Sequence, residues 1–284
     1  MIWRTNRRAF DLTNRGVIMG VINVTPDSFS DGGNFNSAQA AIDHGLRLAE
    51  EGAEILDIGG ESTRPGAAPV SAEEELQRVL PVIEGLAGKT SAALSIDTSK
   101  AAVARAAVAA GAEIINDVTA LQGDNEMPRI AAESGCAVVL MHMRGTPRTM
   151  QKDPQYTDVV TEVAAHLRER IAAARAADIE AERIAIDPGI GFGKTVEHNL
   201  QLIAGLGHFA ALGHPVLLGV SRKSFLAVAA DCPEVRDRDV PTAALTAIGY
   251  GLGARIFRVH TVRPNVQTLR IAESLAAQAP TQSR

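Results

Sequence analysis

Short runs of apolar and β-branched residues recur along the chain, and each run ends in polar or glycine-rich sequence. Eight of these runs predict strands: VIMGVI (17–22), EILDIG (54–59), AALSID (92–97), EIIND (113–117), AVVLMH (137–142), RIAID (183–187), PVLLGVS (215–221) and RIFRVH (255–260). Runs that are nearly continuously apolar are typical of strands covered on both faces, as in parallel sheets.

Helical patterns separate the predicted strands. They cover residues 37–51, 71–86, 99–110, 125–134, 158–177, 198–211, 242–252 and 264–279. Ser71 and Glu74 match a capping box at the start of one helix, and Gly111 follows the end of another. This strand–helix alternation, with no break in composition, predicts a single (β/α)8 TIM barrel; a doubly wound parallel sheet is the alternative.

The barrel is expected to form one catalytic domain over residues 17–279. Residues 1–16 precede the first strand, and we expect them to form a short N-terminal extension that covers the floor of the barrel, where the strands begin. Residues 280–284 are expected to be a frayed tail.

The composition narrows the possible functions. The 284 residues are 46% hydrophobic and 21% charged, and their net charge of −5 argues against binding nucleic acid through bulk positive charge. Two cysteines, Cys136 and Cys232, are too few for a disulfide scaffold or a thiolate zinc site. The chain has no recognisable signal peptide and no apolar run approaching transmembrane length, so we expect a cytoplasmic protein with no membrane partner.

Nearly every predicted strand ends in a residue with a functional group. These residues are Asn23, Asp57, Asp97, Asn116, His142, Asp187, Ser221 with Lys223, and Arg258 with His260. Functional residues of (β/α)8 barrels lie at the carboxyl ends of the strands and in the loops that follow. We therefore expect these side chains to meet at one mouth of the barrel, although some of them serve as caps.

Two pairs among these residues suggest chemistry. Arg258 and His260 are two positions apart on the last strand, so both point to the same face, and phosphate is often bound near the last two strands of such barrels. The pair suggests an anion site; an arginine that only pairs with a carboxylate is the alternative. Asp97 and Asp187 suit a metal ion, acid–base catalysis or hydrogen bonds to a planar heterocycle, and their spacing does not choose among these.

Three loops complete the pattern. The segment IDPGIGFGKT (186–195) resembles a P-loop, but Pro188 stands where that motif requires glycine. We interpret it as a loop whose glycines let the backbone approach a flat ligand, with Phe192 available to stack on it. The long loops NVTPDSFSDGG (23–33) and GGESTRPG (59–66) suggest mobile lids, with Phe29 and Arg64 as their functional residues.

These segments together resemble one enzyme family. MGVINVTPDSFSDGG, DIGGESTRPGA, SIDTSK, IINDV, LMHMRGTP, IDPGIGFGKT, GVSRKSF and RVH are similar, in order from Val17 to His260, to the bacterial dihydropteroate synthases. The resemblance implies a folate-pathway transferase that joins p-aminobenzoate to 6-hydroxymethyl-7,8-dihydropterin diphosphate, giving 7,8-dihydropteroate and pyrophosphate. It also implies Mg²⁺ and a homodimer, and we expect pyrophosphate to leave before the amine attacks.

The resemblance assigns roles residue by residue. Asn23 would bind Mg²⁺ together with the diphosphate. The pterin would be held by Asp97, Asn116, Asp187 and Lys223. Arg258 and His260 would contact both the pterin and the diphosphate. The lids and the aminobenzoate site would be formed by Phe29, Thr63, Arg64 and Pro65, with Ser224 nearby. The residues expected to be catalytic are Asp97, Asp187, Lys223, Arg258 and His260.

Two positions depart from the family pattern. Thr261 stands where the family usually has aspartate, which puts in doubt a partner for His260, and Ile190 replaces a usual phenylalanine. Two rival functions remain: a methyltetrahydrofolate-binding domain of a corrinoid methyltransferase, and a paralogue that has lost catalysis and only binds a pterin or a partner.

Overall fold

The computed structural model describes residues 1–25, 33–63 and 66–278, and eight parallel strands within them close into a barrel. Around the barrel the strands follow the order β10, β3, β4, β5, β6, β7, β8, β9. Their bounds are β3 (Val17–Asn23), β4 (Ile55–Gly59), β5 (Ala93–Asp97), β6 (Ile114–Asp117), β7 (Ala137–Met141), β8 (Ile184–Asp187), β9 (Val216–Leu218) and β10 (Ala254–Val259). The predicted (β/α)8 barrel is confirmed, and the doubly wound alternative is wrong.

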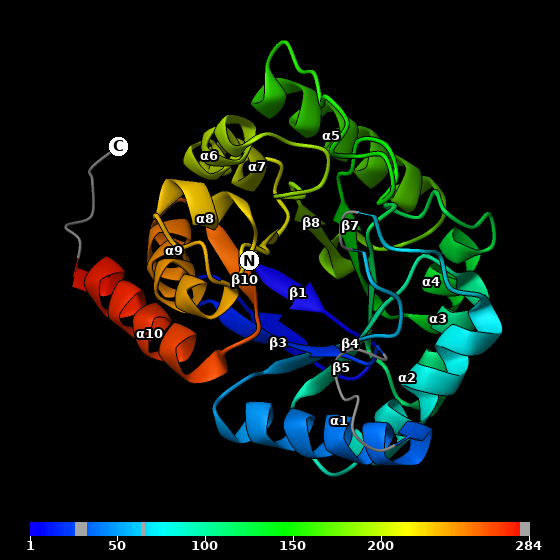
Figure 1. Cartoon of the computed structure of the whole chain (residues 1–284). Coiled ribbons are helices and arrows are strands. Elements are labelled where there is room, and N and C mark those ends of the chain that lie inside the picture. Colours follow the sequence, from blue (N-terminus) through cyan, green and yellow to red (C-terminus); the bar gives the residue numbers. More distant parts are fainter. Residues whose placement is uncertain (26–32, 64–65, 279–284) are drawn as a thin grey trace.

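Helices surround the strands in a ring (Figure 1). They are α1 (Gly33–Glu50), α2 (Ala72–Leu86), α3 (Ala101–Ala110), α4 (Met127–Ser134), α5 (Val159–Ala176), α6 (Val196–Ala204), α7 (Leu206–Ala210), α8 (Phe225–Ala229), α9 (Asp239–Gly251) and α10 (Val262–Gln278). Short 3₁₀ helices are η2 (Ala181–Arg183) and η3 (Val235–Arg238). No helix in the described ranges is long and apolar enough to cross a membrane.

The helices differ from the prediction in two places, and one predicted cap is confirmed. The helix expected over 198–211 is divided at Gly205 into α6 and α7, because glycine disfavours the helix interior. Helix α8 follows β9 although no pattern indicated it, since a helix of five residues is too short to show a period. Ser71 caps α2 as expected, its hydroxyl accepting from the backbone N–H of Glu74 at 3.1 Å.

Alternation along the strands divides the barrel interior into two layers. The layer near the beginnings of the strands is apolar and includes Ile55 and Ile256. Two residues further along the same strands, the interior face carries Asp57 and Arg258. Successive side chains of a strand point to opposite faces, so the intervening residues, such as Leu56 and Phe257, face the helices and form the larger outer core.

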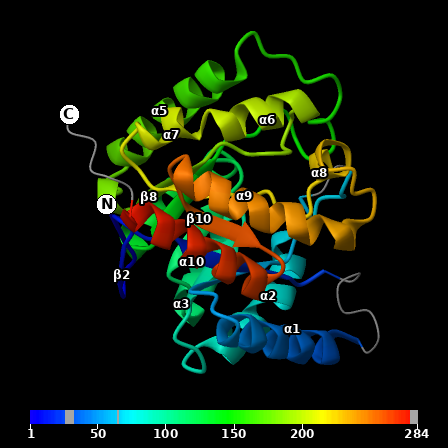
Figure 2. The ribbon, with the colours of Figure 1, turned by 90° about the vertical axis from the view of Figure 1, so that its left-hand side faces the viewer.

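An antiparallel hairpin closes the floor of the barrel. Strand β1 (Ile2–Arg4) pairs with β2 (Ala9–Asp11), and Figure 2 shows this hairpin at one end of the barrel. Trp3 is fully buried against the apolar interior layer, and its ring lies 5.7 Å from that of Phe10. Its indole N–H donates to the carbonyl of Arg183 at 3.1 Å. The hairpin therefore shields the apolar layer from water.

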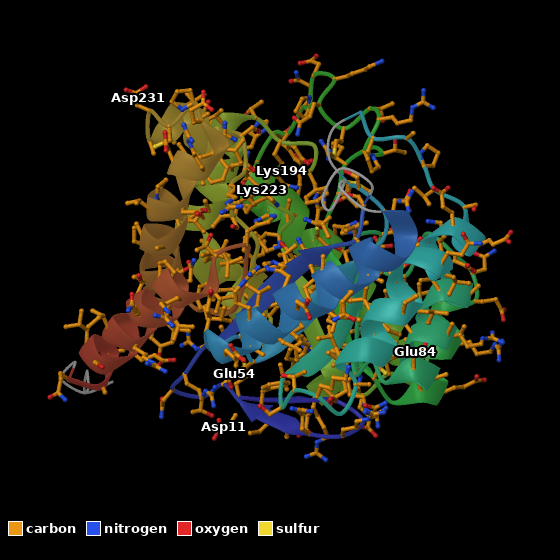
Figure 3. All side chains as sticks on the ribbon, turned by 60° about the horizontal axis from the view of Figure 1, so that its bottom comes forward. Asp11, Glu54, Glu84, Lys194, Lys223 and Asp231 are labelled. Atoms are coloured by element: carbon orange, nitrogen blue, oxygen red, sulfur yellow. The ribbon has the colours of Figure 1, made fainter. Side chains whose placement is uncertain are left out.

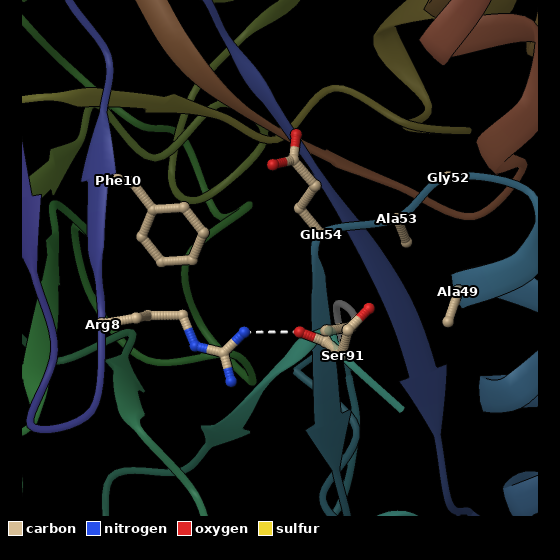
Figure 4. Close-up of a pocket in the computed structure, with 8 residues that line it drawn as sticks. Arg8, Phe10, Ala49, Gly52, Ala53, Glu54 and Ser91 are labelled. Atoms are coloured by element: carbon tan, nitrogen blue, oxygen red, sulfur yellow. Dashed lines mark hydrogen bonds between the residues drawn. The ribbon is translucent and has the colours of Figure 1, made fainter. Parts of the chain in front are cut away.

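A buried carboxylate joins the hairpin to the barrel. Glu113, immediately before β6, accepts hydrogen bonds from the hydroxyl of Thr5 at 2.9 Å and from Nη2 of Arg8 at 2.7 Å. Arg8 also donates to the carbonyl of Ser91 beside a cavity of about 300 Å³ (Figure 4). Glu54 lines this cavity and also a second one of about 340 Å³. Both cavities lie at the floor, away from the carboxyl ends of the strands.

We predict that Trp3→Ala lowers the free energy of unfolding by about 3–5 kcal/mol, because the substitution removes the burial of a whole indole ring and leaves a cavity in the apolar layer. Urea denaturation followed by circular dichroism is the suitable measurement, since Trp3 is the single tryptophan of the chain. Ile2→Ala on the opposite face of β1 is the control, with an expected change within about 0.5 kcal/mol. Equal effects of the two substitutions would contradict the burial argument.

Candidate active site

Four strand ends lie in one row at the mouth of the barrel. Asn23 on β3 is paired in register with Gly59 on β4, Gly59 with Asp97 on β5, and Asp97 with Asn116 on β6. A Cβ atom at Gly59 would lie 3.5 Å from Cβ of Asp97. The missing side chain therefore leaves space beside the Asp97 carboxyl that a flat ligand can use.

Asp57 is the hub of a buried hydrogen-bond network beneath this row. Its carboxylate accepts from Ser95 Oγ at 2.6 Å, from Asn116 Nδ2 at 3.1 Å and from Arg258 Nε at 2.6 Å. Nη2 of Arg258 donates to Asp97 Oδ2 at 2.7 Å. Arg258 therefore joins β10 to β4 and β5, and the predicted meeting of the eighth strand with the third is observed.

The position of Arg258 bears on both sequence interpretations. Its guanidinium pairs with carboxylates, as in the structural alternative, but only two of the five N–H donors of an arginine are used in these two bonds. Burial lowers the pKa of Arg258, and the charges of Asp57 and Asp97 more than offset this effect, so the pKa is raised. Arg258 is thus a permanent cation with donors left for a ligand.

The carboxyl group of Asp97 has an unusual acidity. Burial raises its pKa, the charge of Arg258 opposes the rise, and the nearby charge of Asp57 adds to it, leaving the pKa at about 7. Near neutral pH this group therefore exists in both protonation states. Strongly shifted pKa values of this kind are typical of functional sites.

Asp187, at the end of β8, lies between two lysines. Its Oδ1 accepts from the backbone N–H of Gly189 at 2.6 Å, and burial raises its pKa while the charge of Lys223 opposes the rise. Burial lowers the pKa of Lys223 to about 8 and that of Lys194 to about 7, and Asp187 opposes both shifts. Figure 3 shows the two lysines next to each other, at the end of the molecule away from Glu54.

Gly219, immediately after β9, lies close to both Asp187 and Arg258. A Cβ atom at Gly219 would lie 3.8 Å from Asp187 Oδ2 and 4.0 Å from Cβ of Arg258. The sixth and eighth strands of the barrel therefore bring their charged ends together, as the sequence predicts. Together with Asp97, these groups surround one opening at the carboxyl ends of the strands.

Four successive carbonyl groups of the glycine-rich loop accept side-chain hydrogen bonds. Lys223 donates to the carbonyl of residue 190, Gln151 to that of 191 at 2.7 Å, Lys194 to that of 192 at 3.0 Å and Tyr156 to that of 193 at 3.0 Å. Lys223 also lies 4.6 Å from the ring centroid of Phe192. The loop is thus held in one shape, with its aromatic ring beside a predicted ligand-binding lysine.

The glycines of this loop are required by its backbone. Gly189, Gly191 and Gly193 have φ values of 69°, 82° and 67°, in the left-handed region that other residues rarely adopt. A Cβ atom at Gly189 would lie 1.8 Å from the carbonyl oxygen of His142. Gly189 therefore lets the loop pack closely against the backbone that follows β7, and the approach of this loop to a flat ligand stays a prediction.

Lys194 is a buried lysine beside the site that the sequence interpretation missed. Only 3% of its surface is exposed, and Nζ lies 3.0 Å from Nδ1 of His142. Burial, reinforced by the charge of Lys194, lowers the pKa of His142 to about 2, so this imidazole is neutral. The signal was present in GFGKT, but the lysine was considered only as part of a P-loop.

The remaining predicted residues occupy different places. Thr63 and Asn23 are half-buried, and Ser224 is exposed immediately before α8. Phe29, Arg64 and Pro65 lie outside the described residues. His260 follows β10, and its Nδ1 lies 2.9 Å from Oγ of Ser221.

Thr261 has a defined partner. Its hydroxyl donates to Oδ2 of Asp239 at 2.8 Å, and Nη2 of Arg222 donates to the same hydroxyl at 2.9 Å. A carboxylate from the start of α9 therefore stands next to the position after His260. Asp239 is a second residue that the sequence interpretation missed, because nothing local links positions 239 and 261.

Comparisons with known proteins agree on one family. A model of the pterin binding enzyme family matches residues 19–260. Dihydropteroate synthase of Escherichia coli strain K12 is 46% identical over 257 residues, which cover 90% of each chain. The structure of Xanthomonas albilineans dihydropteroate synthase with 4-aminobenzoic acid has a TM-score of 0.91 and 47% identity, covering 98% of each chain. A second structure of that protein, in complex with 7,8-dihydropteroate, has a TM-score of 0.88 and 45% identity, covering 99% of this chain and all of the other.

We predict that the free energy of unfolding of the wild type, relative to Asp97→Asn, decreases as the pH rises. The pKa of Asp97 is raised from 3.8 to about 7 in the folded protein, so its contribution to stability is full below about pH 4 and is lost as the pH rises through about 7. Urea denaturation at about pH 5 and about pH 8 measures the difference. Lys194 titrates in both proteins and largely cancels. The charge of Asp97 helps to hold up the pKa of Lys223, so its removal lowers that pKa and changes the difference in the same direction. A difference that is the same at both pH values would show that Asp97 has an ordinary acidity.

Proposed function

This chain belongs to the dihydropteroate synthases of the pterin-binding enzyme family, and from that premise we propose how its own residues carry out their reaction. It is a transferase that joins p-aminobenzoate to 6-hydroxymethyl-7,8-dihydropterin diphosphate, giving 7,8-dihydropteroate and pyrophosphate. The corrinoid methyltransferase and the non-catalytic paralogue are set aside on the same grounds. The observation that carries the proposed mechanism is the bridge from Arg258 to Asp57 and Asp97, with Asp187 beside it.

We propose that the pterin lies over the acidic row of strand ends. Asp97 and Asp187 would accept hydrogen bonds from ring N–H groups, because an ionised carboxylate is an acceptor only. Asn116 and Lys223 would complete the edge of the pocket. The glycines at 59 and 219 leave space beside the two carboxyl groups, which supports a planar ligand at this position.

The diphosphate would be bound by cations at the other side of the opening. Arg258 keeps unused donors after binding its two carboxylates, and His260 follows directly after the end of the same strand. Charge developing on the leaving oxygen would be stabilised by these donors, which are already oriented before the reaction. Arg64 of the second lid is proposed to assist, although it lies outside the described residues.

Magnesium fits this site only as a companion of the substrate. In the described ranges, no group of three or more His, Cys, Asp or Glu side chains is arranged to hold a metal ion. Mg²⁺ commonly uses one or two protein ligands together with substrate phosphates and water. The half-buried amide of Asn23, at the end of β3, suits one such ligand. When bound, the ion would neutralise charge on the diphosphate.

The aminobenzoate would bind nearer to solvent than the pterin. Ser224 is exposed and follows Lys223 directly, and Phe192 lies against that lysine. We propose that these residues, with Thr63 and the lid residues Phe29, Arg64 and Pro65, form the aminobenzoate site. The bound 4-aminobenzoic acid in the Xanthomonas albilineans structure supports a site of this kind in the fold.

We propose that pyrophosphate leaves before the amine attacks. The departing oxygen takes the electron pair of its bond to the methylene carbon, and the resulting cation is delocalised into the pterin ring. The carboxylates of Asp97 and Asp187 favour positive character in that ring. The neutral arylamine then uses its lone pair to form the new C–N bond to the methylene carbon, and the resulting ammonium loses one proton to solvent or to the released pyrophosphate. Because the arylamine is already nucleophilic when neutral, the reaction needs neither a covalent enzyme intermediate nor a strong general base.

We predict that the wild type, supplied with pterin diphosphate and Mg²⁺, releases pyrophosphate in the absence of p-aminobenzoate. Arg258→Ala should slow this release roughly 10²–10³-fold, the usual loss when one oriented donor is removed. Arg255→Ala is the matched control on the same strand, because Arg255 points outward and stacks on Tyr250. Strict dependence of pyrophosphate release on the amine would favour direct displacement, and a normal rate in Arg258→Ala would refute its leaving-group role.

We also propose that the chain forms a homodimer through helices α9 and α10. These two helices pack together and carry exposed apolar side chains, with Ile248 52%, Ile271 63% and Leu275 68% exposed.

A cytoplasmic location stays a prediction.

For this proposal we expect the wild type to sediment as a dimer at micromolar concentration and the variant Ile271→Glu/Leu275→Glu as a monomer, since two buried charges without partners oppose association. Leu200→Glu, at an exposed leucine of α6, is the control and should remain a dimer. A monomeric wild type would overturn the proposed dimer.

A further inference from the structure

Arg222, in the turn after β9, has a left-handed backbone conformation and stands between Ser221 and Lys223. The backbone N–H of Lys223 donates to the carbonyl of Val220 at 3.2 Å, closing a turn whose third residue is Arg222. Arg222 has a φ of 59°, a value that turns normally assign to glycine at this position. A residue with a side chain persists there only when its surroundings hold it, and such positions cluster at functional sites.

The surroundings of Arg222 hold both its side chain and its backbone. Nε and Nη2 donate to the two oxygens of Asp239 at 2.7 and 2.8 Å, and Nη2 also donates to the hydroxyl of Thr261 at 2.9 Å. The backbone N–H donates to Thr242 Oγ1 at 3.3 Å, and the carbonyl accepts from Arg238 Nη1 at 3.2 Å. The start of α9 and the residue after His260 thus fix the turn from two sides.

Asp239 is suited to this task by its charge. Burial raises the pKa of Asp239, but the hydrogen bonds from Arg222 and Thr261 outweigh that effect and hold the pKa below its usual value. The carboxylate is therefore ionised at neutral pH. A two-oxygen contact to a planar guanidinium also fixes the direction of the arginine, which a lysine would not provide.

The residues on either side of Arg222 face the active site. Ser221 is buried, and its Oγ accepts from the backbone N–H of His260 at 3.1 Å and lies 2.9 Å from Nδ1 of that residue. Lys223 donates to the carbonyl of Ile190 and lies against the Phe192 ring. A rotation of the turn at Arg222 would move both contacts together.

We propose that Arg222, clamped by Asp239 and Thr261, is a positioning residue that fixes Lys223 and, through Ser221, His260 in the orientations that bind the pterin diphosphate. The inference rests on the roles proposed above for Lys223 and His260. Arg222 itself acts without touching the substrate. An ordinary surface ion pair gives no reason for a left-handed backbone at this residue, whereas a device that sets two neighbouring side chains does.

The test moves the carboxylate from one side of the guanidinium to the other. Asp239→Asn removes the negative charge that faces the guanidinium of Arg222. Thr261→Asp, added to the same variant, supplies a new carboxylate from position 261, where the hydroxyl oxygen of Thr261 lies 2.9 Å from Nη2 of Arg222 in the wild type. Steady-state kinetics at 25 °C give kcat/KM for the pterin diphosphate, and the melting temperature of each variant is measured alongside. Glu54→Gln, which removes a somewhat more exposed ion pair with Arg15 at the barrel floor, is the control.

We expect Asp239→Asn to lower kcat/KM for the pterin diphosphate about 10- to 100-fold, the range caused by small misplacement of binding groups. The double variant Asp239→Asn/Thr261→Asp should recover most of this loss, and Glu54→Gln should stay within about twofold of the wild type. A merely structural ion pair would lower the melting temperature without this kinetic loss and rescue.

Two results would overturn the inference: kcat/KM of Asp239→Asn within twofold of the wild type, or a loss that Thr261→Asp does not recover. Either result, obtained with a wild type that forms dihydropteroate normally, leaves the proposed mechanism standing. If substitutions of Lys223 and of His260 leave kcat/KM for the pterin diphosphate unchanged, the mechanism on which the inference rests is overturned instead.

Discussion

The guanidinium of Arg258, held between the carboxylates of Asp57 and Asp97, is the interaction on which the upper half of the barrel depends. Without this cation, two acids would be buried side by side with no compensating charge, a state that is strongly unfavourable. A buried ion network of this kind is poor evidence for stability, because well-packed apolar residues often serve equally well. The network keeps charged and oriented groups in place at the carboxyl ends of the strands, as the proposed binding of the pterin diphosphate requires.

The network is possible because the interior has two layers with different chemistry. The lower layer is apolar and closed by the hairpin that contains Trp3, so the floor excludes water. The upper layer carries Asp57, Asp97, Asp187 and Arg258 toward the carboxyl ends of the strands. The same two-residue period that places Ile256 below Arg258 builds both layers, so the scaffold and the site arise from one alternating pattern.

The sequence was sufficient for the barrel because each strand is a strong local signal and the alternation with helices leaves few topologies. The sequence also predicted that Asp97, Asp187 and Arg258 lie close together, because each stands at or near the carboxyl end of a strand and these ends meet at one mouth of the barrel. It could not predict that Arg258 pairs with Asp57 and Asp97, because interior neighbours depend on the stagger between strands. Nor could it find the role of Lys194 or the clamp from Asp239 to Arg222, which rest on contacts between loops distant in sequence. The three-residue strands β1 and β2 are too short to show a period.

The acidity of Asp97 links ligand binding to the solvent. In the ligand-free protein, burial and the charge of Asp57 raise the pKa of its carboxyl group to about 7. The ionised form accepts a hydrogen bond from a ring N–H more strongly than the protonated form does, so entry of the pterin would displace a fraction of a proton into the buffer. Binding of the pterin is then coupled to release of a proton, and the apparent binding enthalpy includes the heat of protonating whichever buffer is present.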